Sequence, residues 1–207
     1  YQPDRVLLQS FDDGQVIVWD FDRSAQIAEF RMDGAARPVA YDRSGARLLV
    51  LREGSLHALQ SSGEGRQAPM AEGFPASAAA LGAARVILLG GADGSTARID
   101  ARGALTRGRK QFAAPVTQLV ADAGSRRFAA LAANHEAKLF DEREQVVTSL
   151  RDVVELSAFG RNGTIAARLV SGQIITVARG GATTTHAPAA RVQSISLNTG
   201  GARLLVV

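Results

Sequence analysis

The chain has 207 residues, of which 46% are hydrophobic and only 5% aromatic, so it is long enough to bury an aliphatic core. It contains no cysteine, which excludes disulfide frameworks, Cys-based zinc sites and thiol nucleophiles. The formal net charge is +4, but the arginines are scattered. The densest basic cluster, 102–110, has no interleaved aromatic residues to stack on bases, so the charge does not predict a nucleic-acid site.

Short apolar runs separated by turn residues predict β-strands along the whole chain. Near-continuous apolar runs, typical of strands buried on both faces, lie at 5–8, 47–51, 85–89, 128–131, 165–170 and 203–207. Each of the first five is followed by a more alternating run, typical of a strand nearer a sheet edge, at 15–20, 55–60, 95–100, 136–141 and 173–178. Glycines interrupt the chain too often for long helices. The longest apolar stretch, 76–89, is too short and too broken to cross a membrane, so no membrane insertion is expected.

Turn residues recur with a period of about 40 residues. One series consists of Asp12-Asp13-Gly14, Arg52-Glu53-Gly54, Ala92-Asp93-Gly94, Asn134-His135 and Ser171-Gly172. A second series, out of phase with the first, runs through Asp42–Gly45, Gly82, Asp122–Gly124, Arg161–Gly163 and Asn198–Gly200. The hexapeptide Gly-Ala-Arg-Leu-Leu-Val occurs at Gly45–Val50 and again at Gly201–Val206, 156 residues or four periods of 39 later. This period, with four short strands in each unit, predicts a β-propeller.

The repeated segments resemble those of the WD40 family. Val16-Ile17-Val18-Trp19-Asp20 is similar to the end of a WD40 repeat, and Ala97–Asp100 and Lys138–Asp141 occupy the equivalent positions. Ala40–Gly45 resembles the WD40 turn usually written Phe-Ser-Pro-Asp-Gly, and Ala158–Gly163 is another copy. The resemblance implies four-stranded antiparallel blades, with strands lettered a to d from the axis outward, and a role in holding proteins or peptides. It also implies that Trp19 packs between adjacent blades.

We therefore expect an all-β chain that forms one propeller domain over residues 1–207. The blades are expected at 1–32, 36–71, 75–112, 114–152 and 153–187, with a partial blade at 190–207. Both ends of the chain supply a b strand and cannot complete one blade together, so we expect about five blades that belong to a larger ring of six or seven. The excess of Arg over Lys and the abundant Ala and Gly are typical of a GC-rich bacterial source. A cytoplasmic location is expected, with a periplasmic one left open.

No sequence motif predicts catalysis, a cofactor or a metal site. Gly90–Ser95 lacks the lysine of a Walker A loop and precedes a strand instead of a helix. Asp12 and Asp13 are expected at a hairpin tip without the further ligands of a calcium loop. The three histidines, His57, His135 and His186, fall in different blades. No Gly-x-Ser-x-Gly nucleophile elbow is present.

The expected function is a non-catalytic scaffold or sensor module whose loops contact a protein or peptide partner, or another domain of the same polypeptide. The candidate contact residues are Arg52, Glu53, Asp93, Asn134 and His135, which share one face with the connections 32–36, 72–75, 112–115 and 187–190. The alternative is an enzymatic or ligand-binding propeller of the quinoprotein or lactonase type. It would place its groups on the a strands, where the sequence offers only Val39, Ala78, Gln118, Glu155 and Ser194. A nucleic-acid platform is a third, disfavoured hypothesis.

Overall fold

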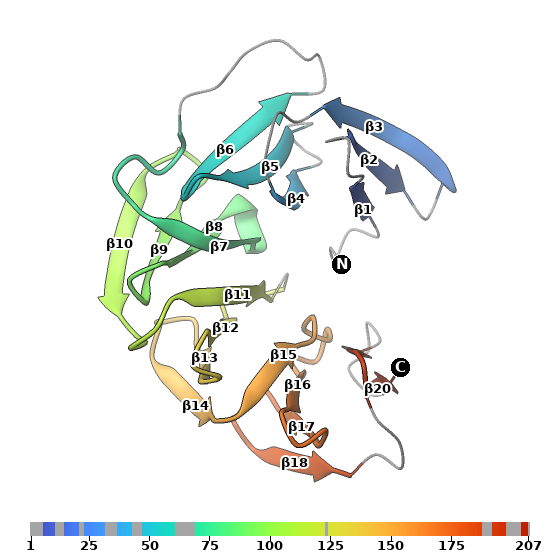
Figure 1. The fold of residues 1–207 in the computed structure, drawn as a ribbon, viewed down its shortest axis with the longest axis vertical. Coiled ribbons are helices and arrows are strands. Elements are labelled where there is room, and N and C mark those ends of the chain that lie inside the picture. Colours follow the sequence, from blue (N-terminus) through green and yellow to red (C-terminus); the bar gives the residue numbers. More distant parts are fainter. Residues whose placement is uncertain are drawn as a thin grey trace.

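The computed structural model describes residues 6–10, 15–20, 23–31, 37–42, 47–60, 69–122, 124–187, 192–197 and 204–206. Their strands form six antiparallel sheets that succeed one another in an arc around a central channel (Figure 1). The first sheet holds β1 (Val6–Ser10), β2 (Gln15–Asp20) and β3 (Ala25–Arg31), and the second holds β4 (Arg37–Asp42), β5 (Arg47–Arg52) and β6 (Ser55–Gln60). The third holds β7 (Ala76–Leu81), β8 (Ile87–Gly91), β9 (Ser95–Ile99) and β10 (Leu105–Lys110).

The remaining strands continue the same order. The fourth sheet holds β11 (Val116–Ala121), β12 (Phe128–Ala132), β13 (Ala137–Phe140) and β14 (Val146–Leu150). The fifth holds β15 (Val153–Leu156), β16 (Ile165–Leu169), β17 (Ile174–Val177) and β18 (Thr183–His186), and the sixth pairs β19 (Ile195–Leu197) with β20 (Leu204–Val206). In each complete sheet the first strand lies nearest the channel and the fourth lies outermost (Figure 1).

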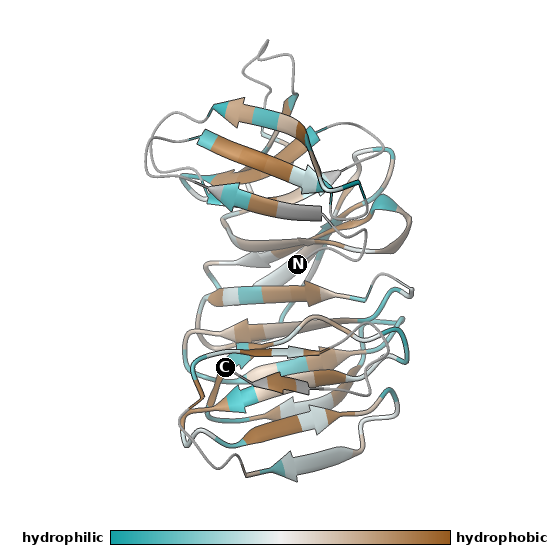
Figure 2. Cartoon of the chain, turned by 90° about the vertical axis from the view of Figure 1, so that its right-hand side faces the viewer, coloured by the Kyte–Doolittle hydropathy of each residue, from teal (hydrophilic) through white to brown (hydrophobic). Residues whose placement is uncertain are grey.

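Alternating strand directions send the loops to two opposite faces of the arc, as the edge-on view shows (Figure 2). We call one the bc face, formed by the turns between second and third strands and by the connections between sheets. It holds the turns 52–55, 91–95, 132–136 and 169–173 with the connections 72–75, 111–115 and 151–152. We call the other the ab face. It is formed by the turns between the first and second strands and between the third and fourth strands of each sheet. It holds 82–86, 122–127 and 157–164 with 100–104, 141–145 and 178–182.

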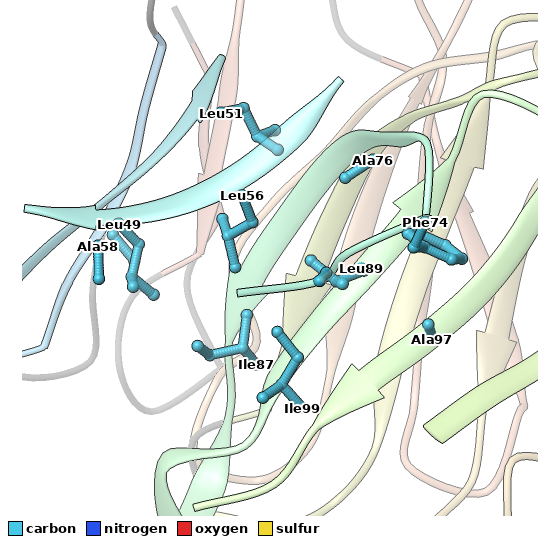
Figure 3. Packing of buried hydrophobic residues seen from close by; sticks show 12 residues of the cluster. Leu49, Leu51, Leu56, Ala58, Phe74, Ala76, Ile87, Leu89, Ala97 and Ile99 are labelled. Carbon is cyan, nitrogen blue, oxygen red and sulfur yellow. The ribbon is translucent and has the colours of Figure 1, made fainter. Parts of the chain in front are cut away.

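The hydrophobic core lies between neighbouring sheets. Between the second and third sheets, Leu49 and Leu56 face Ile87, Leu89 and Ile99, all buried (Figure 3). Similar clusters lie at each of the other junctions along the arc. Both faces of a middle strand therefore contact a neighbouring sheet, which explains the near-continuous apolar runs at β5, β8 and β12.

A β-bulge occurs at the same place in four of the sheets. The pairing of the first strand with the second shifts register between Pro38 and Ala40, and again between Ala76 and Ala78. The same shift recurs between Val116 and Gln118, where β11 pairs with β12, and between Val153 and Glu155, where β15 pairs with β16. A bulge bends a strand and increases its twist. In these four sheets the bulge lies near the start of the first strand, next to the bc face.

An aspartate at the end of the third strand fixes the turn that follows it. The Asp100 Oδ1 accepts hydrogen bonds from the amides of Arg102 and Ala104, both at 2.9 Å. The Asp141 Oδ1 accepts the equivalent bonds from Arg143 and Gln145, both at 2.8 Å. Asp20 ends β2, the strand of the first sheet that carries the WD40-like segment, and it corresponds to Asp100 and Asp141 in the repeat. Its Oδ1 accepts a 3.2 Å bond from the amide of Arg23. The aspartate of the repeated segment thus acts as a local turn cap.

The structure confirms an all-β propeller arc of four-stranded antiparallel blades. Three sheets have four strands; the first two have three and the sixth has two among the described residues. The described parts of the duplicated hexapeptide both form the second strand of their sheet, β5 and β20. The only helical turn in the described part is a 3₁₀ turn at Ala83–Arg85. Asp12, Asp13 and the connection 32–36 lie outside the described residues.

Trp19 does not pack at the junction between the first and second sheets. Val16 and Val18 point from β2 toward the second sheet, and they belong to the cluster at that junction. Because side chains alternate along a strand, Trp19 lies on the opposite face of β2. It is half-buried there, and its Nε1 donates a 3.3 Å hydrogen bond to Gln9 Oε1.

Candidate interaction surfaces

Backbone hydrogen bonds tie three of the bc-face turns to the sheet that follows. The carbonyl of Gly54 accepts a 2.7 Å bond from Ala76 N, at the start of the third sheet. The carbonyl of Gly94 accepts from the amides of Gln111 and Phe112, before the fourth sheet. In the next turn the His135 carbonyl accepts a 2.9 Å bond from Val153 N.

A second set of bonds ties three of the turns to the connection that leads into their own sheet. Ala92 N donates to Pro75 O and Ala133 N donates to Pro115 O, both at 2.8 Å. Val170 N donates to Asp152 O at 2.7 Å. The turns 91–95 and 132–136 are therefore held from two sides, while bonds from one side hold 52–55 and 169–173 among the described residues.

All five candidate contact residues lie on this face. Glu53, Asp93, Asn134 and His135 are exposed at the turn tips, and Arg52 is half-buried beside them. Glu53 and His135 adopt positive φ values of 49° and 64°, the left-handed conformation that such turns require. The His135 Nδ1 lies 3.0 Å from Val153 O, so the ring also joins the turn to the start of β15.

Asp93 shapes its turn through Ser95. Its Oδ1 accepts bonds from Ser95 Oγ at 2.6 Å and from Ser95 N at 2.9 Å. These bonds stabilise the ionised carboxylate, so they lower the pKa of Asp93 below its ordinary value. Asn134 occupies the same position in the next sheet, where its Oδ1 accepts a 3.4 Å bond from Glu136 N.

The polar side chains of the first strands connect neighbouring sheets near the channel. The Gln118 amide group donates to Leu156 O at 2.9 Å and accepts from Leu156 N at 3.0 Å, which joins β11 to β15. The Ser77 hydroxyl donates a 2.6 Å bond to Val116 O, and so joins β7 to β11. Glu155 pairs with Arg168 at 2.9 Å and accepts a 3.3 Å bond from Ile195 N.

A cavity of about 350 Å³ lies along the channel and opens toward the ab face. Of the residues considered for an enzymatic channel, Val39 and Gln118 line it, while Ala78 is buried and Ser194 exposed. Most of the other lining side chains are aliphatic, contributed mainly by β7 and β11. Asp122 and Arg161 supply its charged groups, at its ab-face end.

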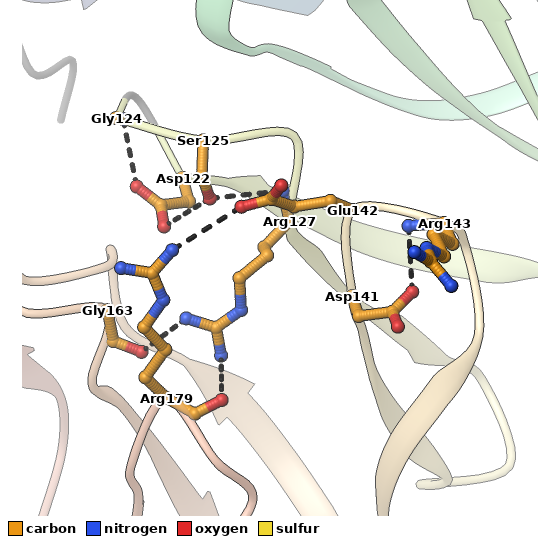
Figure 4. Close-up of polar contacts among 9 residues, drawn as sticks. All are labelled: Asp122, Gly124, Ser125, Arg127, Asp141, Glu142, Arg143, Gly163 and Arg179. Atoms are coloured by element: carbon orange, nitrogen blue, oxygen red, sulfur yellow. Dashed lines mark hydrogen bonds and ion pairs between the residues drawn. The ribbon is translucent and has the colours of Figure 1, made fainter.

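On the ab face, Arg127 holds the fourth and fifth sheets together (Figure 4). Its side chain is buried, and its guanidinium donates to Gly163 O at 3.1 Å and to Arg179 O at 3.0 Å. The guanidinium carbon also lies 5.6 Å from the centre of the Phe159 ring. Burial lowers the pKa of Arg127 and nearby Asp122 opposes that shift, so the group stays charged.

A second hollow, which we call the inter-sheet groove, opens on the ab face between the third and fourth sheets. It has a volume of about 240 Å³, and Val86, Leu88 and Phe128 supply its apolar side chains. Arg98, Arg126 and Glu144 are among its charged lining residues. The Arg98 Nη1 lies 2.8 Å from Glu144 Oε1, so an ion pair joins the two sheets at the groove.

Sequence reasoning missed both Arg127 and the groove. A signal for Arg127 was present, because arginine opens the predicted second strand at Arg5, Arg47, Arg85 and Arg203, and Arg127 directly precedes the run at 128–131. A groove between two sheets depends on how the sheets meet, which no single segment encodes.

Neither hollow brings together His57, His135 and His186, which lie in β6, in a bc-face turn and at the end of β18. In the part of the chain that the structure describes, no three His, Asp or Glu side chains gather into a metal-binding group. No helix there is long and apolar enough to span a membrane.

Comparison with known proteins defines the class through the fold alone. No model of a known protein family matches the sequence, and no curated protein matches it. The computationally designed protein Ika8 matches 96% of this chain with a TM-score of 0.67 at 17% identity. The β-propeller domain of Cps50 (Swd1) from Myceliophteria thermophila matches 98% of it with a TM-score of 0.70, also at 17% identity. The chain spans 64% of the Ika8 chain and 76% of the Cps50 chain. It therefore has the β-propeller fold.

Proposed function

We propose that this chain is a non-catalytic, WD40-like scaffold or sensor module that holds a protein or peptide, or another domain of its own polypeptide, on the bc face. The doubly bonded turns of that face carry the proposal. They present Asp93, Asn134 and His135 to solvent on a backbone fixed from both sides, and Glu53 lies exposed in a turn that is bonded to the third sheet. A surface ordered before binding loses little conformational entropy when a partner docks.

The channel side chains support a scaffold over an enzyme. Gln118 and Glu155 are already committed to bonds between sheets, so using either in catalysis would require breaking a structural contact. The channel cavity favours a second candidate, a small-molecule sensor, because its volume falls within the usual range for ligand sites. Its aliphatic lining would suit an apolar ligand.

Matched alanine pairs at exposed turn tips test which face holds the partner. Protein captured from source cells by the tagged chain would be identified, purified and titrated against each variant by calorimetry. We expect Glu53→Ala with Asn134→Ala to weaken binding by about tenfold or more. Arg102→Ala with Arg143→Ala, at exposed tips on the ab face, is expected to leave it unchanged. Equal affinity for both variants, or no partner that binds the purified chain directly, would reject the proposal.

A further inference from the structure

The inter-sheet groove combines an apolar surface with arginines. Phe128 is buried and Leu88 nearly so, which gives the groove a firm apolar wall, while Arg98 and Arg126 are more accessible. An arginine guanidinium binds a carboxylate through two parallel hydrogen bonds when the geometry permits. The groove therefore offers adjacent contacts for an apolar side chain and an acidic one.

Glu144 already places a carboxylate in this groove, at a position where its backbone favours glycine. Its φ is 62°, and the equivalent turns of the third and fifth sheets have Gly103 at 86° and Gly181 at 90°. A left-handed conformation is strained for a non-glycine residue. The turn nevertheless carries a glutamate, and its side chain reaches across to Arg98. The pair is partly exposed, with 41% and 35% of the two side chains accessible, so an incoming group can replace one partner.

Arginines outnumber carboxylates in the groove lining, where Arg98, Arg126 and Arg127 accompany Asp100 and Glu144, and this balance favours a negative ligand. Among the described residues of the ab face, Arg102, Arg126, Arg143 and Arg161 are exposed and have no ion pair. Arg126 lines the groove itself, and Arg143 precedes Glu144 in the same turn. The aromatic side chain in the lining is the buried Phe128, so no exposed ring offers a stacking platform for bases. A carboxylate from a polypeptide fits this chemistry better than a nucleic acid.

We propose that the inter-sheet groove binds an acidic peptide segment, whose carboxylate contacts Arg98 and Arg126 while a neighbouring apolar side chain packs on Val86 and Leu88. In the free protein Glu144 occupies the carboxylate position on Arg98 and competes with the ligand. The groove lies on the face opposite to the turns of the proposed scaffold surface. Either proposal can therefore fail while the other stands.

Fluorescence anisotropy with a defined probe tests this directly. The probe is a short fluorescein-labelled peptide of Asp and Glu around one central Leu, and its twin replaces the acids with Asn and Gln. We expect the acidic peptide to bind, with affinity that falls as salt rises, and the neutral twin not to bind. Arg126→Gln is expected to weaken binding by about tenfold, the loss of one charge-assisted contact. Glu144→Gln keeps the side-chain shape but removes the competing charge, so it should strengthen binding by about threefold.

Arg151→Gln is the matched control, since Arg151 is an exposed arginine on the bc face. It should leave the affinity for the acidic peptide unchanged, and thermal unfolding should show that all three variants remain folded. Equal binding of the two peptides would overturn the proposal, as would a Glu144→Gln variant that binds no better. An equal loss in Arg151→Gln would indicate non-specific charge attraction. An oligothymidylate that binds with the same dependence on Arg126 would identify a general polyanion surface instead.

Discussion

Arg127 is a charged residue whose role is structural. Its guanidinium takes the place of water as the hydrogen-bond donor to the carbonyls of Gly163 and Arg179, which belong to two different turns of the fifth sheet. Removing it leaves two acceptors and the Asp122 carboxylate without their cation. We expect Arg127→Met to lower the free energy of unfolding by about 3 kcal/mol, measured by urea denaturation. Its neighbour Arg126 is exposed, so Arg126→Gln should change that free energy by no more than about 0.5 kcal/mol. Equal effects of the two substitutions would contradict the assignment.

The Ser95 hydroxyl sets the pKa of Asp93. We expect Ser95→Ala to raise that pKa toward its ordinary value, because the variant loses the first and largest of the interactions that stabilise the carboxylate. The measurement is a carboxyl NMR titration. A folded-state pKa below the unfolded value stabilises the fold above the unfolded pKa, and that contribution is lost as the pH falls through the folded pKa. The variant should therefore lose less stability in acid than the parent. Thr117→Ala, on the same face, should leave the Asp93 pKa unchanged.

At the scale of single residues, local chemistry could be predicted and long-range partners could not. Asp93, Asn134 and His135 follow from turn propensity, because the residue types that tolerate such backbones are few. Their common face follows from the repeat period. Arg127, by contrast, contacts residues 36 and 52 positions away. Nothing within its own segment distinguishes it from the exposed arginine beside it.

At the scale of elements, the bc-face turns join successive sheets. A Cβ added to Gly94 would lie 2.2 Å from the carbonyl oxygen of Phe112, whereas one added to Gly172 would meet nothing within 4 Å. Both residues have positive φ, so alanine is strained at each. We expect Gly172→Ala to cost about 1 kcal/mol from the backbone alone. Gly94→Ala should cost clearly more, because the connection to the fourth sheet must also move. Calorimetric melting of the two variants compares them, and equal losses would show that the turn contact contributes nothing.

Strands with a strong pattern could be placed closely from the sequence. The expected runs at 15–20 and 55–60 coincide with β2 and β6. The run expected at 85–89 is shifted, since β8 begins at Ile87 after a 3₁₀ turn at Ala83–Arg85. Outer strands were the hardest to place. β18 is exposed at all four positions and has no alternation, so it owes its conformation to pairing with β17.

At the scale of the whole molecule, the main contacts between different sheets join neighbours in the arc. Such an architecture can lose stability locally, as repeat proteins do. Phe140 of the fourth sheet is fully buried and stacks on Phe128 at a ring separation of 4.4 Å. We expect Phe140→Ala to cost about 3–5 kcal/mol and to shift the circular dichroism midpoint in urea. The urea midpoint followed by the fluorescence of Trp19, in the first sheet, should shift less.

Val18→Ala provides the reverse test, since Val18 is buried in the first sheet. In that variant the urea midpoint followed by Trp19 fluorescence should shift more than the midpoint followed by circular dichroism. Coincident shifts of both probes in both variants would mean that the whole arc unfolds as one cooperative unit.

The bulge that recurs in the first strand of four sheets bears on how the chain arose. A bulge is one extra residue in one strand, and it sits at the same step in β4, β7, β11 and β15. The residue type at that step is not constant, since it is valine at Val39 and Val154 but a hydroxyl residue at Ser77 and Thr117. Four independent insertions at one step are a less economical history than tandem duplication of a single ancestral unit that already contained it. The side chains have since diverged, while the backbone irregularity has been inherited.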